Sequence, residues 1–211
     1  MLFRSKSADI APTPGRVVPF GTVPVIVVRT AAGELRAFSA TCTHLSCTVQ
    51  YRADLEHILR ACKGTTGETE FVVIGSQCIL GRHPDAPRVL RQSMEADVYP
   101  RFKPELAPLI EGSLGRYSQF DLTFGYHADG VGPETAKLPA DWESRLIPVC
   151  NENTGGATGW CLEPHDLAYS KLAARRQKDL AFVSAMLEHH LAKASQLRSL
   201  IESTPDATLR S

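Results

Sequence analysis

The chain has 211 residues, which is enough for one ordinary domain or two small ones. Its 23 Lys and Arg residues balance its 23 Asp and Glu residues, which argues against a protein held on nucleic acid or an anionic membrane by its overall field. The hydrophobic fraction of 43% and the charged fraction of 22% are typical of a globular chain, and no run of about 18 apolar residues predicts a membrane span.

The first residues and the cysteine content predict a cytoplasmic protein. Basic residues near the start are not followed by an apolar segment, so no secretory signal is predicted. Six cysteines are too few for a disulfide scaffold in a chain of this length. We therefore expect Cys78, Cys150 and Cys161 to be small buried side chains.

Residues 1–51 have the pattern of β structure and form the first predicted domain. The β-branched run at residues 23–30 is followed by a short turn containing glycine and by a second extended run at residues 35–40. Two extended runs around a short turn predict a β-hairpin. The sequence changes character after residue 51, where we place a domain boundary.

Residues 52–211 mix helical and extended patterns, which predicts an α+β domain with a small mixed sheet and C-terminal helices. The Gly- and Pro-rich middle, residues 100–140, is interpreted as loops with one or two short strands, and no role is assigned there to His127. The other expected elements are a helix near residues 55–62, strands at 71–80, 95–99, 145–150 and 159–163, and helices from Pro164 onward.

A metal-binding pattern lies at residues 42–47, which read Cys-Thr-His-Leu-Ser-Cys. A thiolate and an imidazole two residues apart suit a borderline or soft metal ion. With this hexapeptide and the extended runs before it, residues 23–51 resemble the first half of a Rieske iron–sulfur domain. The resemblance implies that Cys42 and His44 would be cluster ligands and that Cys47 would form a disulfide.

The second ligand pair of such a cluster is not found in the corresponding part of the sequence. A Rieske [2Fe–2S] centre needs two Cys and two His, one pair from each of two loops. In the nearest match to the second loop, Arg60 stands in place of the Cys and Lys63 in place of the His. Cationic side chains supply neither thiolate nor imidazole. We therefore expect no 2Fe–2S cluster in this chain alone, and electron transfer remains an alternative function.

A second constellation begins where the extended run that starts at Phe71 meets Gly75 and Ser76. A small Gly-Ser turn exposes backbone N–H groups and a hydroxyl to a phosphate. Further along, Glu95 and Asp97 lie two positions apart on a predicted strand, so both carboxylates face the same side. Two neighbouring carboxylates repel each other unless a divalent cation lies between them, and Mg²⁺ prefers oxygen ligands of this kind.

Cationic residues follow in the C-terminal third of the chain. Lys171, Arg175 and Lys178 fall at offsets of four and three, which predicts one stripe along a single helix. This stripe would meet phosphates or the acidic pair, or would simply face water. If both the stripe and the acidic pair are solvated, the protein would be a non-catalytic interaction module, and this alternative stays open.

Residues 52–200 resemble a family of uncharacterised bacterial proteins that are nucleotidyltransferase-like and are related to the AbiE-type toxins of toxin–antitoxin systems. The resemblance implies a nucleoside triphosphate and Mg²⁺ as cofactors, an antitoxin as a partner, and no membrane. The acceptor is left open between a protein hydroxyl, an RNA end and a small molecule. The segments that carry the resemblance are residues 70–87, 93–100, 124–139 and 151–180.

The same resemblance implies a role for individual residues. A third catalytic carboxylate is not apparent, and Glu152 and Glu163 are the candidates for it. In the implied site, Gly75 and Ser76 would hold the nucleotide phosphates, Glu95 and Asp97 would bind Mg²⁺, and Lys171, Lys178 and Asp179 would complete the pocket.

Overall fold

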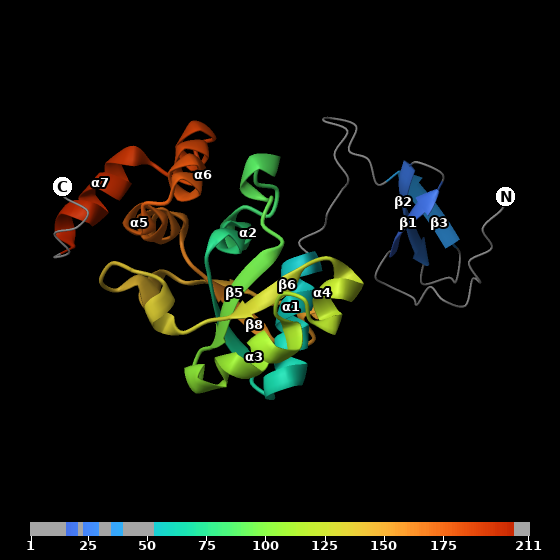
Figure 1. Ribbon diagram of the computed structural model, residues 1–211. Helices are drawn as coiled ribbons and strands as arrows, with labels where there is room; N and C mark the ends of the chain where they lie inside the picture. The colour runs from blue at the N-terminus through green and yellow to red at the C-terminus, as the bar shows by residue number, and fades with distance from the viewer. Residues whose placement is uncertain (1–15, 21–22, 30–34, 40–52, 205–211) are drawn as a thin grey trace. The chain divides into compact units, whose positions relative to one another are not determined.

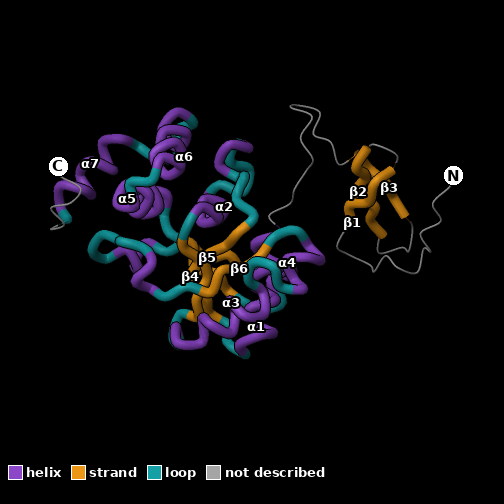
Figure 2. Tube along the Cα trace, in the orientation of Figure 1, coloured by secondary structure: helices purple, strands orange, loops and turns teal. Residues whose placement is uncertain are grey.

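The structure of the chain is a computed structural model that describes residues 16–20, 23–29, 35–39 and 53–204 (Figure 1). The chain divides into two compact units, residues 1–51 and residues 52–211. The described helices all belong to the second unit, whereas strands occur in both (Figure 2). Cys42, His44 and Cys47 lie outside the described residues, so their implied roles stay predictions.

The described part of the N-terminal unit is a three-stranded antiparallel sheet. Its central strand β2 (Val23–Arg29) pairs with β1 (Arg16–Phe20) on one side and with β3 (Leu35–Ser39) on the other. β2 and β3 confirm the predicted hairpin. β1 was not predicted. It is an edge strand that contains Pro19, and proline is tolerated in a sheet mainly at an edge.

The second unit is built around a five-stranded mixed sheet with the strand order β6-β5-β4-β8-β7. β4 runs antiparallel to β5 and parallel to β8, while β6 is parallel to β5 and β7 is antiparallel to β8. This sheet confirms the α+β class. The strands are β4 (Glu70–Ile74), β5 (Glu95–Pro100), β6 (His127–Gly130), β7 (Ile147–Val149) and β8 (Thr158–Cys161).

Seven α-helices accompany this sheet in the described residues: α1 (Ala53–Thr66), α2 (Ile79–Arg82), α3 (Ala107–Leu114), α4 (Gln119–Phe124), α5 (Pro164–Ala174), α6 (Gln177–Glu188) and α7 (Ala194–Ser203). α1 and α3 pack together on one face, and α2 and α5 cover the other, with α6 and α7 packed on α5 (Figure 1). In the part of the chain that the structure describes, no helix combines the length and the apolar character needed to cross a membrane.

The helix α1 forms because its apolar residues recur on one face. Leu55, Ile58, Leu59 and Cys62 are each at most 1% exposed, and they pack into the core of the unit. The chain leaves the helix at Gly67, whose φ of 76° favours glycine. The helix predicted from this spacing is confirmed.

Residues 100–140 contain β6, one of the expected short strands, but they also contain the α-helices α3 and α4, which were not expected. α3 carries a proline in its first turn and Gly112 in its interior, and α4 has only 6 residues. Neither helix has the length or the composition from which a helical period can be read. Ile110 and Leu114 of α3 are buried, so tertiary packing stabilises this helix.

The cysteine prediction is correct at two positions and wrong at the third. Cys78 and Cys161 are buried in the core, whereas Cys150 is exposed. Cys150 directly follows β7, where the chain leaves the sheet. The apolar strand before it therefore gives no information about its burial.

Candidate functional site

Four side chains with metal-ligating groups share one face of the neighbouring strands β5 and β6. Glu95 and Asp97 alternate along β5 with residues that are completely buried on the opposite face. The parallel register places Glu95 beside His127 and Asp97 beside Asp129. Because paired residues of adjacent strands point to the same face, the four side chains form one group, here named the β5–β6 patch.

Asp97 is the carboxyl group of this patch that its surroundings affect most. Burial raises the pKa of Asp97 to about 6, and the negative charges of Glu95 and Asp129 add to the rise. Burial also raises the pKa of Asp129. The positive charges of Lys171 and Arg176 act in the opposite direction on Asp97 without restoring its ordinary value. Oxygen ligands that raise one another's pKa fit Mg²⁺, whose charge offsets their repulsion.

Gly75 allows the turn after β4 to lie against Asp97. Its φ of 84° lies in the region that favours glycine, and a Cβ at this position would overlap the Asp97 carboxylate. Ser76 then begins a 3-10 helix that continues into α2. The strand predicted at residues 71–80 is confirmed only as far as Ile74, and residues 76–82 form the 3-10 helix and α2 instead. The Gly-Ser turn lies beside the predicted acidic pair.

Lys171 connects this turn to the C-terminal helices. Its Nζ donates a hydrogen bond to Ser76 Oγ at 2.9 Å and lies 3.2 Å from Asp179 Oδ1. The Asp179 side chain is 1% exposed and also accepts a hydrogen bond from Arg176 Nε at 2.5 Å. Asp179 thus holds two cationic side chains in place, and its carboxylate is directed at them.

Lys171 and Lys178 lie on different helices, so the predicted stripe along one helix is wrong. α5 ends just before Arg175, which adopts a left-handed conformation with a φ of 55°, and α6 begins just after Arg176. The change of direction brings Arg176, rather than Arg175, to the lining of the cavity described next. Lys178 is exposed and also lines this cavity.

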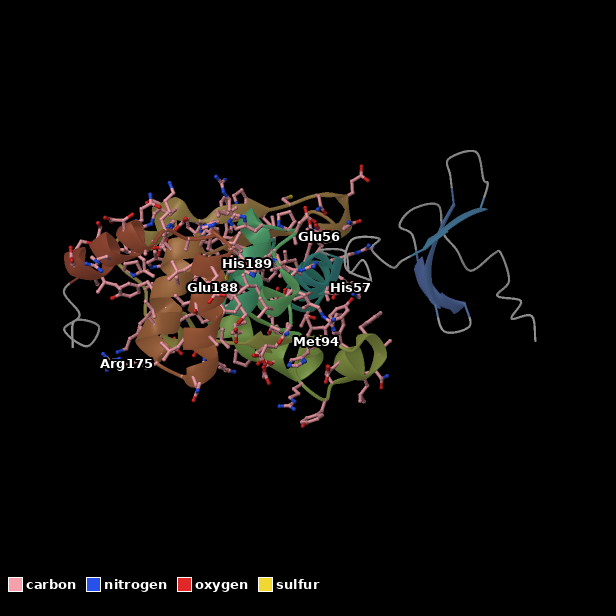
Figure 3. The ribbon with its side chains drawn as sticks, turned by 90° about the horizontal axis from the view of Figure 1, so that it is seen from above. Glu56, His57, Met94, Arg175, Glu188 and His189 are labelled. Carbon is pink, nitrogen blue, oxygen red and sulfur yellow. The ribbon has the colours of Figure 1, made fainter. Side chains whose placement is uncertain are left out.

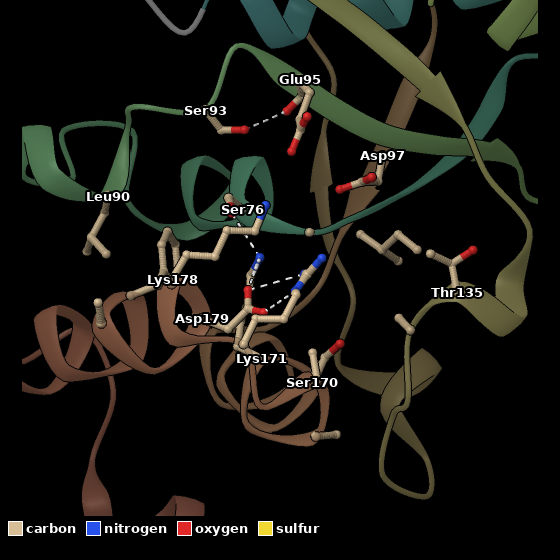
Figure 4. Close-up of a pocket in the computed structure, with 18 of the residues that line it drawn as sticks. Ser76, Leu90, Ser93, Glu95, Asp97, Thr135, Ser170, Lys171, Lys178 and Asp179 are labelled. Carbon is tan, nitrogen blue, oxygen red and sulfur yellow. Dashed lines mark hydrogen bonds and ion pairs between the residues drawn. The ribbon is translucent and has the colours of Figure 1, made fainter.

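The acidic and cationic groups meet in a cavity of about 850 Å³, within the usual range for small-molecule sites. Glu95 and Asp97 point toward it from β5, and Lys171 and Lys178 approach from the helices on the other side (Figure 4). Apolar side chains also line the cavity, namely Val89, Leu90, Met94 and Phe182.

Asp129 is the site residue that sequence reasoning missed. Of the two proposed third carboxylates, Glu152 is exposed and Glu163 caps the N-terminus of α5, and neither lines the cavity. The third carboxylate beside Asp97 is Asp129, which the strand register brings there. The alternation of His127 and Asp129 was the one available signal, but β6 has only 4 residues and no apolar run.

The fold and the cavity can now be compared with known families. The family model described as nucleotidyltransferase of unknown function (DUF6036) matches residues 53–208. The chain belongs to this family. The DUF6036 match includes the Gly-Ser turn, the β5–β6 patch and the helices that carry Lys171 and Lys178. Searches of curated proteins and of solved structures found no match.

A second family model, the Rieske [2Fe-2S] domain, matches residues 3–77. The end of this match overlaps α1 and β4, which belong to the DUF6036 domain. Arg60 and Lys63, at the positions where a second ligand pair was sought, lie on α1, and Lys63 Nζ donates a hydrogen bond to the backbone oxygen of Gly155 at 2.8 Å. This segment is a helix, so it does not form the second ligand loop.

Proposed function

We propose that residues 53–204 form a Mg²⁺-dependent nucleotidyltransferase that uses a nucleoside triphosphate. The observation that carries the proposal is the convergence of three carboxylates, Glu95, Asp97 and Asp129, beside a Gly-Ser turn and opposite a cationic wall. Membership of the DUF6036 family supports the same reading. A strongly raised pKa at a half-buried carboxyl group such as Asp97 is typical of a functional site and less typical of a solvated interaction surface.

The carboxylates of the β5–β6 patch would hold the metal. Glu95 and Asp97 line the cavity, and Asp129 lies next to Asp97 on β6. When bound, Mg²⁺ supplies positive charge to the nucleotide phosphates and to the attacking oxygen. The three residues contribute the negative charge and the fixed oxygen positions that this binding needs.

The opposite wall would bind the phosphates. Lys171 is held between Ser76 and Asp179, and Arg176 is held by the same Asp179. Both cations are therefore oriented before a ligand arrives, which lowers the cost of binding it. Lys178 is exposed at the rim of the cavity and can approach the outer phosphates.

In the proposed reaction, an acceptor hydroxyl attacks the α-phosphorus of the nucleotide. A new P–O bond forms to the acceptor, the bond to the β-phosphate breaks, pyrophosphate leaves, and the hydroxyl proton passes to water. The positive charges of Lys171, Arg176 and Lys178 offset the negative charge that develops on the pyrophosphate. A toxin–antitoxin setting, with an antitoxin as partner, is proposed only from the sequence resemblance.

The experiment measures the transfer of label from each of the four α-labelled ribonucleoside triphosphates to an acceptor. The protein is incubated with the nucleotide, Mg²⁺ and a cell extract that contains protein, RNA and small-molecule acceptors. We expect a covalently labelled product, and we expect Asp129→Asn to lower its rate by at least about 100-fold. Asp85→Asn, at an exposed acidic residue outside the cavity, is the matched control. Equal labelling by wild type and Asp129→Asn would contradict the proposal.

The Rieske match favours electron transfer as a second candidate function for the N-terminal unit. Cys42 and His44 would supply one ligand pair from this chain. A second pair would have to come from another chain. Iron analysis and the absorption spectrum of protein reconstituted without oxygen test this candidate, and an iron-free, colourless product would remove it.

A further inference from the structure

His127 is the member of the β5–β6 patch that the proposed nucleotidyl transfer does not use. Its side chain is 10% exposed, and its Nε2 atom is buried without a hydrogen-bond partner. Buried polar atoms are nearly always paired, and an unpaired one calls for a specific explanation. Nε2 faces the carboxylates of the patch, with Asp129 Oδ1 at 3.5 Å.

The other nitrogen of the ring is already engaged. His127 Nδ1 lies 3.3 Å from Asp121 Oδ1, and the second oxygen of Asp121 accepts a hydrogen bond from the backbone N–H of Tyr117 at 2.8 Å. An ionised carboxylate can only accept, so a neutral His127 ring would donate its proton from Nδ1 to Asp121. The lone pair of that tautomer is on Nε2. Metal-binding histidines use the same arrangement, in which one ring nitrogen binds the ion and the other donates a hydrogen bond to a carboxylate.

His127 and Asp129 present ligand atoms at a distance that suits a single ion, and Glu95 lies close by. One ligand atom each from Glu95, His127 and Asp129 lies within 4.8 Å of the others. Neighbouring ligands of a tetrahedral ion lie about 3.4 Å apart, and opposite ligands of an octahedral ion about 4.2 Å apart. The 3.5 Å between Nε2 and Asp129 Oδ1 is too long for a hydrogen bond but suits two ligands of one ion.

We propose that Glu95, His127 and Asp129 bind a divalent first-row transition metal ion of the Mn²⁺, Co²⁺ or Zn²⁺ class. An imidazole nitrogen suits these ions, whereas Mg²⁺ selects oxygen ligands. Asp121 is a positioning residue that fixes the His127 tautomer. The buried Nε2 atom without a hydrogen-bond partner is the observation, beyond the acidic residues of the patch, that points to a ligand.

This metal site does not rest on nucleotidyl transfer. Its ligand set includes His127 but not Asp97, whereas the proposed nucleotide site depends on Asp97 and the cationic wall. The two sites share Glu95 and Asp129, so a transition metal ion at His127 would change the charge that the nucleotide site presents. The variants His127→Gln and Asp97→Asn therefore separate the two proposals.

The test is titration of the full-length, metal-free protein with Co²⁺ alone, followed by calorimetry and by visible absorption. Besides any Co²⁺ bound by Cys42 and His44, we expect a Co²⁺ site that His127→Gln weakens by more than 100-fold and that Asp121→Asn weakens by about 10- to 100-fold. Asp97→Asn should keep this site. A large excess of Mg²⁺ should leave the His127-dependent signal in place.

The matched control is His189→Gln, at an exposed histidine that follows α6 (Figure 3). This variant should bind Co²⁺ as wild type does. If His127→Gln fails to fold, the ring signals of His127 in the NMR spectrum of wild-type protein provide the second readout, and equimolar Co²⁺ must shift or broaden them. Equal Co²⁺ binding by wild type and a folded His127→Gln, or ring signals that Co²⁺ leaves unchanged, would overturn the proposal.

Discussion

Replacing Asp97 with Asn should stabilise the metal-free protein at neutral and higher pH. In the folded chain the pKa of Asp97 is raised from 3.8 to about 6, chiefly by burial and then by Glu95 and Asp129. Above pH 6 the carboxylate of Asp97 is ionised in the folded state although it is partly buried and close to two other carboxylates. Asn has no charge at this position, so the substitution removes that free-energy cost. A rise of about two pKa units corresponds to about 3 kcal/mol in the free energy of unfolding.

The sign of the effect sets its pH dependence. Below the unfolded pKa of 3.8 the carboxyl group is protonated in both states and carries no such cost. The cost then grows until the pH passes the folded pKa of about 6. We therefore expect Asp97→Asn to gain about 1 kcal/mol at pH 4.5 and about 3 kcal/mol at pH 8.

The assay is equilibrium unfolding in urea at both pH values, with a metal chelator present and with the slope of the transition compared between variants. Asp85→Asn, at an exposed residue, should change the free energy of unfolding little at either pH. With Mg²⁺ added, wild type should gain stability and Asp97→Asn should gain much less. A change that is the same at both pH values, or no gain at all, would refute the electrostatic reasoning.

Two further substitutions test the supports of the site by urea unfolding. Gly75→Ala should lower the free energy of unfolding by about 1 to 3 kcal/mol, because the residue has a φ of 84° and the added Cβ would overlap Asp97. The control is Gly64→Ala, where a Cβ would meet no other atom. Equal effects of the two substitutions would contradict the role of Gly75. Asp179→Ala should lower the free energy of unfolding by about 3 kcal/mol, because it leaves Lys171 buried without its carboxylate partner. A loss below about 1 kcal/mol would show that this ion pair does not stabilise the cationic side of the cavity.

The parts of the fold that were predictable are those whose pattern is local. The helical spacing in α1 and the alternation that places Glu95 and Asp97 on one face of β5 can both be read within a few residues. The Gly-Ser turn has a comparably local cause, because Gly75 is needed at a positive φ. The bounds of β5 were recovered to within one residue, whereas α1 is longer than expected and β4 ends earlier, at Ile74.

The features of the site that were missed depend on the pairing of distant strands, or on a helix C-terminus that no glycine or proline marks in the sequence. Asp129 joins the acidic pair only through the register of β6 with β5, and nothing in the 4 residues of β6 specifies that partner. α5 ends at Arg175 in a left-handed conformation where glycine is the usual residue, so the break before α6 was not visible. The environment of His127 was hidden for the same reason as that of Asp129.

The measurement that tests the central claim most directly is the thermal unfolding of the full chain with Mg²⁺ and each of the four ribonucleoside triphosphates, for wild type and for Asp97→Asn. The account predicts a rise in melting temperature that needs both metal and nucleotide, differs between nucleotides, and is lost in Asp97→Asn. The absence of any shift in wild type at millimolar nucleotide, or a shift of equal size in Asp97→Asn, would contradict a nucleotide site built on the β5–β6 patch.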